Sequence, residues 1–226
     1  MTLVIMREVG VEIAPILASA GILGLAIGFG AQNLVRDFIS GFFIILENQI
    51  RVGDVAIINN TGGLVEQINL RTTVLRDVKG VVHYFQNGNI SSLSNMTNDW
   101  SAYVFDLGVA YKENTDEVVS KIQEVIDSMT SDEKYKALIV EQPEIFGVDK
   151  LDNSAVIIKG RIKTQPIKQW VVGREFLRRI KLSFDDANIE IPFPHSTIYF
   201  GKNTKPLDVA MMESKSEINL DIPVKN

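Results

Sequence analysis

The sequence has no cysteine and only two histidines, and these absences exclude several kinds of site. Without cysteine, the chain forms neither a disulfide nor a thiolate metal site. His83 and His195 lie far apart in the sequence and neither belongs to an HExxH-type pair, so we expect no metal site and no cofactor. Basic residues are outnumbered: 23 lysines and arginines against 28 aspartates and glutamates give a net charge of -5, which argues against a nucleic-acid partner.

The sequence also lacks a recognisable set of nucleophile, base and orienting group. A membrane-bound hydrolase would have to use Asp185 and Asp186, or Asp77 with His83, but adjacent aspartates near the end of a helix are more often a solvated surface. A dinucleotide-binding loop is excluded as well, because no strand precedes the glycine-rich stretch and its spacing is not G-x-G-x-x-G. We therefore expect that the protein is not an enzyme.

One stretch of the chain, Ile13 to Val35, holds no charged residue over 23 positions. As a helix it is about 35 Å long, enough to cross a hydrocarbon core of about 30 Å. The residues before it are not typical of a signal peptide, because their charges follow the short apolar run instead of preceding it. The positive residues Arg36 and Arg51 favour a cytoplasmic position for its C-terminal side. The sequence thus predicts a membrane span.

A helical wheel divides this span into a bulky front, a bulky back and two small flanks. The front carries Leu25 and Phe29, and the flanks hold Ala20, Gly24, Gly28 and Ala31 on one side and Ser19, Ala26 and Gly30 on the other. Together with Gly21, the interior glycines cost about 4 kcal/mol relative to alanine unless close packing offsets them. A helix with two small flanks can stand between identical neighbours in a ring, with the front facing the axis. The alternative is a single anchor helix whose leucine and phenylalanine face lipid.

A second apolar helix is expected after the span, with Leu34, Phe38, Phe42 and Ile45 on one face. It is too short to cross the membrane again, so we expect it near the membrane surface or at the mouth of a pore. The two helices are expected to break at Asn33 or at Gly41. Residues 1–48 thus form the predicted membrane part.

Residues 49–99 change to short runs rich in valine, isoleucine and threonine, separated by turn signals. The pattern predicts four or five strands, with Asn87-Gly88 as the strongest hairpin turn. A small barrel is expected, because closing the sheet hides its edges.

Residues 100–201 follow the order strand, helix, strand, strand, helix, strand, which is typical of a ferredoxin-like α+β domain. The expected helices are Thr115 to Met129 and Trp170 to Ala187, the expected hairpin joins 144–151 to 155–163, and the last strand runs from His195 to Phe200. Residues 202–226 are expected to be a polar tail, in which Ile218 to Pro223 would form a strand only on assembly.

Several stretches of the chain match one family in the same order, from Gly10 to Phe200. They are GILGLAIGFGAQNLVRDFISGFFIILENQIRVGDVAII, GGLVEQINLRTTVLRD, GVVHYFQNGNISS, LGVAY and IPFPHSTIYF. The sequence resembles the small-conductance mechanosensitive channel family. The resemblance implies a homoheptamer in which the glycine-rich helix lines the pore, with a Sm-like barrel and an α/β domain on the cytoplasmic side.

The resemblance also implies roles for single residues. Leu25 and Phe29 fall where two leucine rings form the constriction, and Gly21, Gly24, Ala26 and Gly28 match the small residues along which neighbouring pore helices slide. Phe29 replaces the second leucine, and Asn33 stands where better-known members have a hinge glycine. Family members carry at least two further helices before the pore helix, for which this sequence has no room.

The expected function is that of a channel subunit in a bacterial or archaeal-type cytoplasmic membrane. The channel would open on membrane tension and release ions and small osmolytes, with identical subunits and membrane lipids as partners and no nucleic acid. The alternative is a membrane-tethered Sm-like module that binds RNA or protein.

Overall fold

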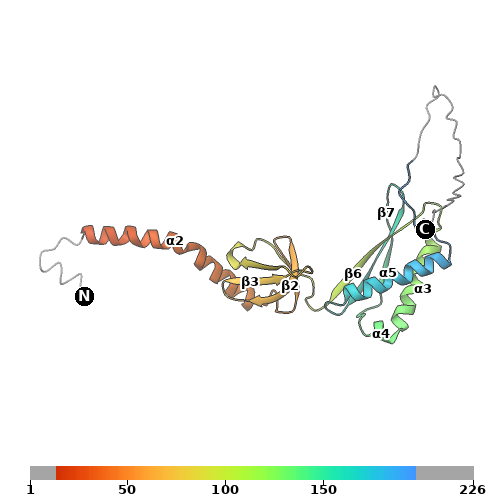
Figure 1. The fold of residues 1–226 in the computed structure, drawn as a ribbon, viewed down its shortest axis with the longest axis horizontal. Helices are drawn as coiled ribbons and strands as arrows, with labels where there is room; N and C mark the ends of the chain where they lie inside the picture. Colours follow the sequence, from red (N-terminus) through yellow and green to blue (C-terminus); the bar gives the residue numbers. More distant parts are fainter. Residues whose placement is uncertain (1–13, 197–226) are drawn as a thin grey trace, which may run out of the picture.

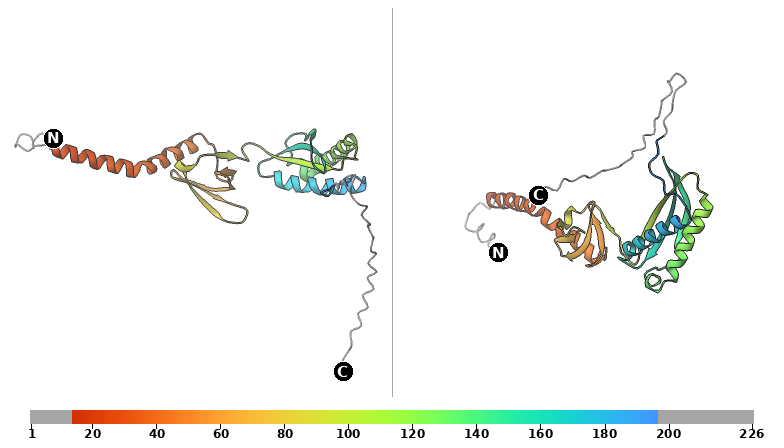
Figure 2. Two further views of the ribbon diagram at one scale, coloured as in Figure 1. Left: turned by 90° about the horizontal axis from the view of Figure 1, so that it is seen from above. Right: turned by 45° about the vertical axis from the view of Figure 1, so that its right-hand side comes forward.

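The computed structural model describes residues 14–196, in which three parts follow one another (Figure 1). A long helix, α2 (Ala14–Leu46), comes first and leads into a five-stranded sheet. A three-stranded sheet with its helices lies at the far end. The three parts touch only in sequence order, so the chain is elongated (Figures 1 and 2).

Helix α2 is 33 residues long, which corresponds to about 50 Å. Its stretch from Leu17 to Leu46 is long and apolar enough to cross a membrane. The helix bends before it reaches the sheet (Figures 1 and 2) but remains helical through both Asn33 and Gly41. The expected break into two separate helices is therefore absent. The reason is that neither residue is a strong enough helix breaker to end a helix that is supported by packing at its C-terminal end.

The five-stranded sheet, called the β-unit below, contains β1 (Val55–Ile58), β2 (Thr61–Ile68), β3 (Thr72–Arg76), β4 (Val82–Gln86) and β5 (Leu93–Asn95). All neighbouring strands are antiparallel, in the order β4-β3-β2-β1-β5. Inward side chains alternate along the strands, and the core contains Ala56, Ile58, Val65 and Leu75 together with Ile44 and Ile50. The five strands confirm the β-rich prediction. Within the described residues, however, the sheet is not closed into a barrel.

The predicted hairpin at Asn87-Gly88 is wrong. β4 and β5 lie at opposite edges of the β-unit and do not pair, and the residues between them include a 3-10 turn, η1 (Asn87–Asn89). The Asn-Gly pair favours a tight turn, but a helix from elsewhere in the chain contacts that turn and determines where the following strand goes.

The second sheet has the order β6-β8-β7, with β6 (Ser101–Val109), β7 (Glu144–Leu151) and β8 (Val156–Thr164) all antiparallel. Helices α3 (Thr115–Ser131) and α5 (Gln169–Asp186) pack on one face, and the short α4 (Glu133–Lys136) follows α3. This assembly, called the α/β unit, confirms the predicted helices and the hairpin between 144–151 and 155–163. Helix α3 begins at the expected Thr115, and the side chain of the preceding Asn114 caps it by accepting a hydrogen bond from the amide of Asp116. Most of the predicted last strand and the tail lie outside the described residues.

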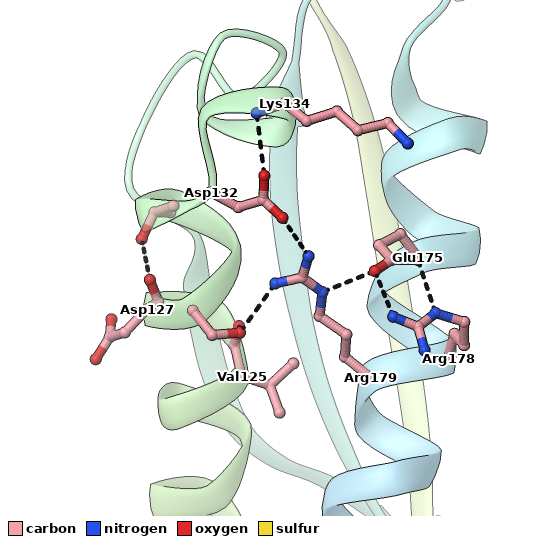
Figure 3. A network of polar contacts seen from close by, with 9 residues as sticks. Val125, Asp127, Asp132, Lys134, Glu175, Arg178 and Arg179 are labelled. Carbon is pink, nitrogen blue, oxygen red and sulfur yellow. Dashed lines mark hydrogen bonds and ion pairs between the residues drawn. The ribbon is translucent and has the colours of Figure 1, made fainter.

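A polar network fastens α3 to α5 (Figure 3). The guanidinium of Arg179 donates to Asp132, Glu175 and Ser128, so one side chain links the end of α3 with the middle of α5. Hydrogen bonds from Arg178 and Arg179 lower the pKa of Glu175 to about 2, against the opposing effect of burial. The network is half-buried, which lets these charges act more strongly than fully solvated pairs.

Candidate functional site

The two predicted constriction residues share one exposed face of α2. Leu25 and Phe29 are one helical turn apart and are 64% and 74% exposed. With Gly24, Gly28 and Gln32 they border a shallow groove of about 400 Å³. Large apolar side chains this open to solvent are typical of a surface that another molecule or another copy covers.

The small residues of the span are equally uncovered. A methyl group added at Gly21, Gly24, Gly28 or Gly30 would meet nothing within 4 Å, and Ala20 and Ala26 are exposed. Within the described chain, no packing therefore offsets the cost of these glycines, which is about 1 kcal/mol each. Any compensating close contact has to come from outside residues 14–196 of the same copy.

The C-terminal part of α2 is anchored to the β-unit through a buried carboxylate. Asp37 is only 5% exposed, and its Oδ1 accepts a hydrogen bond of 2.9 Å from the backbone amide of Gly88. The neighbouring Asn87 is also buried: its Nδ2 donates to the carbonyls of Asn69 and Leu70, and its Oδ1 accepts from Thr73 Oγ1. The turn η1 is thus held on both sides, by the helix and by β3.

Two glycines make this junction possible. A Cβ at Gly41 would overlap the carbonyl of Leu70 and the side-chain amide of Asn87, and a Cβ at Gly88 would lie 2.6 Å from Asp37 Oδ1. Together with Asp37, Gly41 and the buried Ile44 form one stripe on the helix at spacing i, i+4, i+7. In this structure Gly41 therefore permits close approach of two backbones.

Sequence reasoning missed this junction. Asp37 has no assigned role in the sequence analysis, although its spacing to Gly41 and Ile44 is a readable signal. The predicted apolar face of the same segment lies about a quarter turn away around the helix. Its residues Leu34, Phe38, Phe42 and Ile45 are exposed. Contact with the β-unit thus leaves this face uncovered.

Most of the alternative catalytic candidates have structural partners. Asp77 accepts hydrogen bonds from the amides of Val81 and Lys79 and lies 3.3 Å from His83 Nε2, so it shapes the β3–β4 turn. These contacts, the Val81 amide first, lower the pKa of Asp77. Asp185 pairs with Lys181, and Asp186 is exposed. No cluster of three potential metal ligands occurs among residues 14–196.

A membrane-length, glycine-rich helix with an uncovered apolar face, anchored on a β-unit and followed by an α/β unit, is the architecture of a membrane protein with a large domain outside the span. Three family models match the chain in sequence: mechanosensitive ion channel, transmembrane helices 2/3, at residues 1–32; mechanosensitive ion channel, beta-domain, at 33–98; and mechanosensitive ion channel MscS, C-terminal, at 103–191. The chain belongs to the MscS family of mechanosensitive ion channels.

Curated relatives agree with this assignment. The small-conductance mechanosensitive channel of Caldanaerobacter subterraneus subsp. tengcongensis is 38% identical over 194 residues, covering 86% of this chain and 68% of the relative. The moderate conductance mechanosensitive channel YbiO of Escherichia coli is 33% identical over 190 residues, covering 84% of this chain but only 26% of the relative. The matched part is therefore a small share of the longer relative.

Solved structures share the fold. The crystal structure of Helicobacter pylori MscS in its closed state has a TM-score of 0.72 at 24% identity and covers 88% of this chain and 78% of that one. The structure of Arabidopsis thaliana MSL1 has a TM-score of 0.61 at 17% identity, over 83% of this chain and 69% of that one.

Proposed function

We propose that the chain is a subunit of a homoheptameric mechanosensitive channel in a cytoplasmic membrane, which opens on membrane tension and releases ions and small osmolytes. The observation that carries this proposal is the exposed face of α2, where Leu25 and Phe29 stand between two uncovered strips of small residues. In the proposed assembly, residues 1–48 form the pore helix and its membrane-surface extension. Residues 49–99 and 100–201 form the two cytoplasmic domains, followed by the tail from 202 to 226.

The uncovered glycines support a ring of identical subunits. Small residues on both sides of a helix allow each copy to contact one neighbour with each flank. Repeating such a head-to-tail contact gives a closed ring when the rotations from copy to copy add up to a full turn. In lipid, backbones that approach closely gain dispersion contacts, which offset the free-energy cost of glycine in a helix. The flanks proposed for these contacts are Ala20, Gly21, Gly24 and Gly28 with Ala26 and Gly30.

In such a ring, Leu25 and Phe29 face the axis and form the gate. Two stacked apolar rings exclude water when they are narrow, and an ion cannot shed its hydration shell there without a large cost in free energy. Phe29 is bulkier than leucine and narrows the closed ring further. Tension widens the membrane-embedded ring, neighbouring helices slide along their small flanks, and water then fills the gap.

The junction with the β-unit indicates where α2 can bend during opening. Gly41 and Asp37 are held against Leu70 and Gly88, so the helix C-terminal to Asp37 moves with the β-unit. Of the two candidate hinge positions, Asn33 lies before this anchored stretch, whereas Gly41 lies within it. We infer that a change in tilt of the pore segment is taken up near Asn33.

The second candidate, a membrane-tethered module that binds RNA or protein, has less support. The chain carries a net charge of -5, whereas binding to a phosphate backbone depends on an excess of lysine and arginine. No catalytic role is proposed, and lipids, ions and osmolytes are the expected contacts besides identical subunits.

Patch recording from giant spheroplasts tests the gate. Leu25→Ser and Phe29→Ser should each lower the tension at which the channel opens, because a hydroxyl helps water to wet the constriction. Ile27→Ser is the matched control: Ile27 is similarly exposed but lies on the opposite side of α2. Unchanged thresholds in both front-face variants, or an equal shift in the control, would contradict the gate assignment.

A further inference from the structure

An apolar cleft lies between the β-unit and the beginning of α5. It has a volume of about 750 Å³, which is within the range of small-molecule sites. One wall is formed by β1, β2 and the end of β3 with the turn that follows it. The other is formed by the first turns of α5 and by Ile167, two positions before that helix. The main apolar lining residues are Ile57, Leu64, Met96, Ile167, Trp170 and Val171. The two units face each other here beside the segment that joins β5 to β6 (Figure 1).

Most of the charges at this cleft are already paired. Arg76 binds Glu66 and donates to the carbonyl of Gly80, and the carboxylate of Asp77 is occupied by two turn amides and His83. Arg174 is different: among residues 14–196, no hydrogen bond or ion pair engages its guanidinium. The cleft therefore combines a large apolar surface with one unpaired positive charge.

The geometry of α5 places that charge next to an aromatic ring. Trp170 and Arg174 are four residues apart on the helix, so both side chains lie on the side that borders the cleft. An unpaired guanidinium forms strong charge-assisted hydrogen bonds with a carboxylate, while an alkyl chain gains free energy by leaving water for the apolar wall.

We propose that this cleft binds a medium-chain organic carboxylate. Its head group pairs with Arg174, and its alkyl chain lies between Trp170 and the side chains of Leu64 and Met96. This site is separate from the pore face of α2 and adds a ligand to the proposed function. A second copy of the chain is the competing occupant. In a ring of identical copies, a projection on one surface of each copy would enter the cleft on a different surface of the next copy. Val78, the most exposed apolar side chain nearby, lines the cleft itself and does not supply such a projection, so a second copy is less favoured.

The two tryptophans of the chain allow a direct binding test. The Trp100→Phe variant leaves Trp170 as the only tryptophan, and 8-bromooctanoate, whose bromine quenches indole fluorescence, is titrated into the full chain in lipid nanodiscs. We expect saturable quenching of Trp170. Trp170→Phe, which leaves Trp100 outside the cleft, should show no saturable quenching.

The role of Arg174 is tested in the Trp100→Phe background. Arg174→Gln should weaken the binding of 8-bromooctanoate about tenfold and leave that of the neutral 8-bromooctanol almost unchanged, because only the carboxylate uses the charge. Arg178→Gln is the matched control, since Arg178 lies one turn further along α5 and pairs with Glu175.

Three results would overturn the proposal: quenching that does not saturate, equal quenching of Trp100, or no effect of Arg174→Gln. If a second copy fills the cleft, Trp170 will resist both the bromo-acid and acrylamide, which also overturns it. These measurements need no channel opening, so their failure is distinct from failure of the proposed gate.

Discussion

The carboxylate of Asp37 accepts a hydrogen bond from the backbone amide of Gly88, which lies 51 positions later in the chain. This contact joins the membrane-length helix to the β-unit, alongside the close approach at Gly41 and the burial of Ile44. It does so at a buried site where an unmade hydrogen bond costs free energy. The C-terminal part of α2 is therefore fixed to the β-unit by contacts between segments far apart in the chain.

Replacing Asp37 tests this junction. Asp37→Leu should destabilise it by about 1–3 kcal/mol, because the Gly88 amide loses its acceptor while remaining buried. Asp37→Asn keeps an oxygen acceptor of the same shape and is the control. Amide hydrogen exchange at Gly88 should accelerate in the leucine variant alone, and equal exchange in both variants would show that the hydrogen bond does not hold the junction.

Gly41→Ala should destabilise the same junction for a steric reason. The added methyl group meets the carbonyl of Leu70 and the amide of Asn87, and relieving that overlap is expected to cost roughly 1–3 kcal/mol. Thermal unfolding of the purified protein measures the effect. Ser40→Ala, one position earlier and only half-buried, is the control. If alanine at position 41 left the Tm unchanged, the helix would have to dock less closely than described.

Assembly depends on the small flanks of α2 in the proposed ring. Gly24→Leu and Gly28→Leu should reduce the fraction of intact oligomer, because a bulky side chain keeps neighbouring backbones apart. Native mass spectrometry reports the stoichiometry. Ile27→Leu, a volume-conserving change at an exposed position of the same helix, should assemble normally. Normal assembly of both glycine variants would place the subunit contact elsewhere.

The network around Arg179 predicts a pH dependence of stability. The pKa of Glu175 is about 2 in the folded protein against 4.5 for the free group, so its contribution is present above pH 4.5 and disappears as the pH falls toward 2. Thermal unfolding at pH 7 and pH 3 should show a larger loss of Tm in the wild type than in Glu175→Gln. Arg178→Lys keeps the positive charge and should follow the wild type. Parallel losses in wild type and Glu175→Gln would contradict the pKa assignment.

Much of the fold could be predicted from local pattern. The alternation in β8 and the apolar stripe of α3 follow from residues that are neighbours along the strand or helix, and both elements lie within two residues of their expected limits. The uncharged run from Ile13 to Val35 likewise predicts a membrane-length helix, because hydropathy depends only on consecutive residues.

For the functional residues, too, only local features could be predicted. Leu25 and Phe29 could be proposed as a gate from their place on a helical wheel and from family resemblance. The contact between Asp37 and Gly88 could not be predicted. The pair Asn87-Gly88 is as compatible with a hairpin turn as with the 3-10 turn η1 that it forms in the structure. The choice depends on the distant helix that contacts it.

By itself the sequence determined the uncharged helix with its small flanks, the alternating strands, and the absence of thiol chemistry, because each depends on residue type and short-range spacing. Only the tertiary structure decided that α2 stays continuous through Gly41, that Asp37 is buried, and that an unpaired Arg174 borders an apolar cleft. These features arise from contacts between segments far apart in the chain, whose geometry no local pattern specifies.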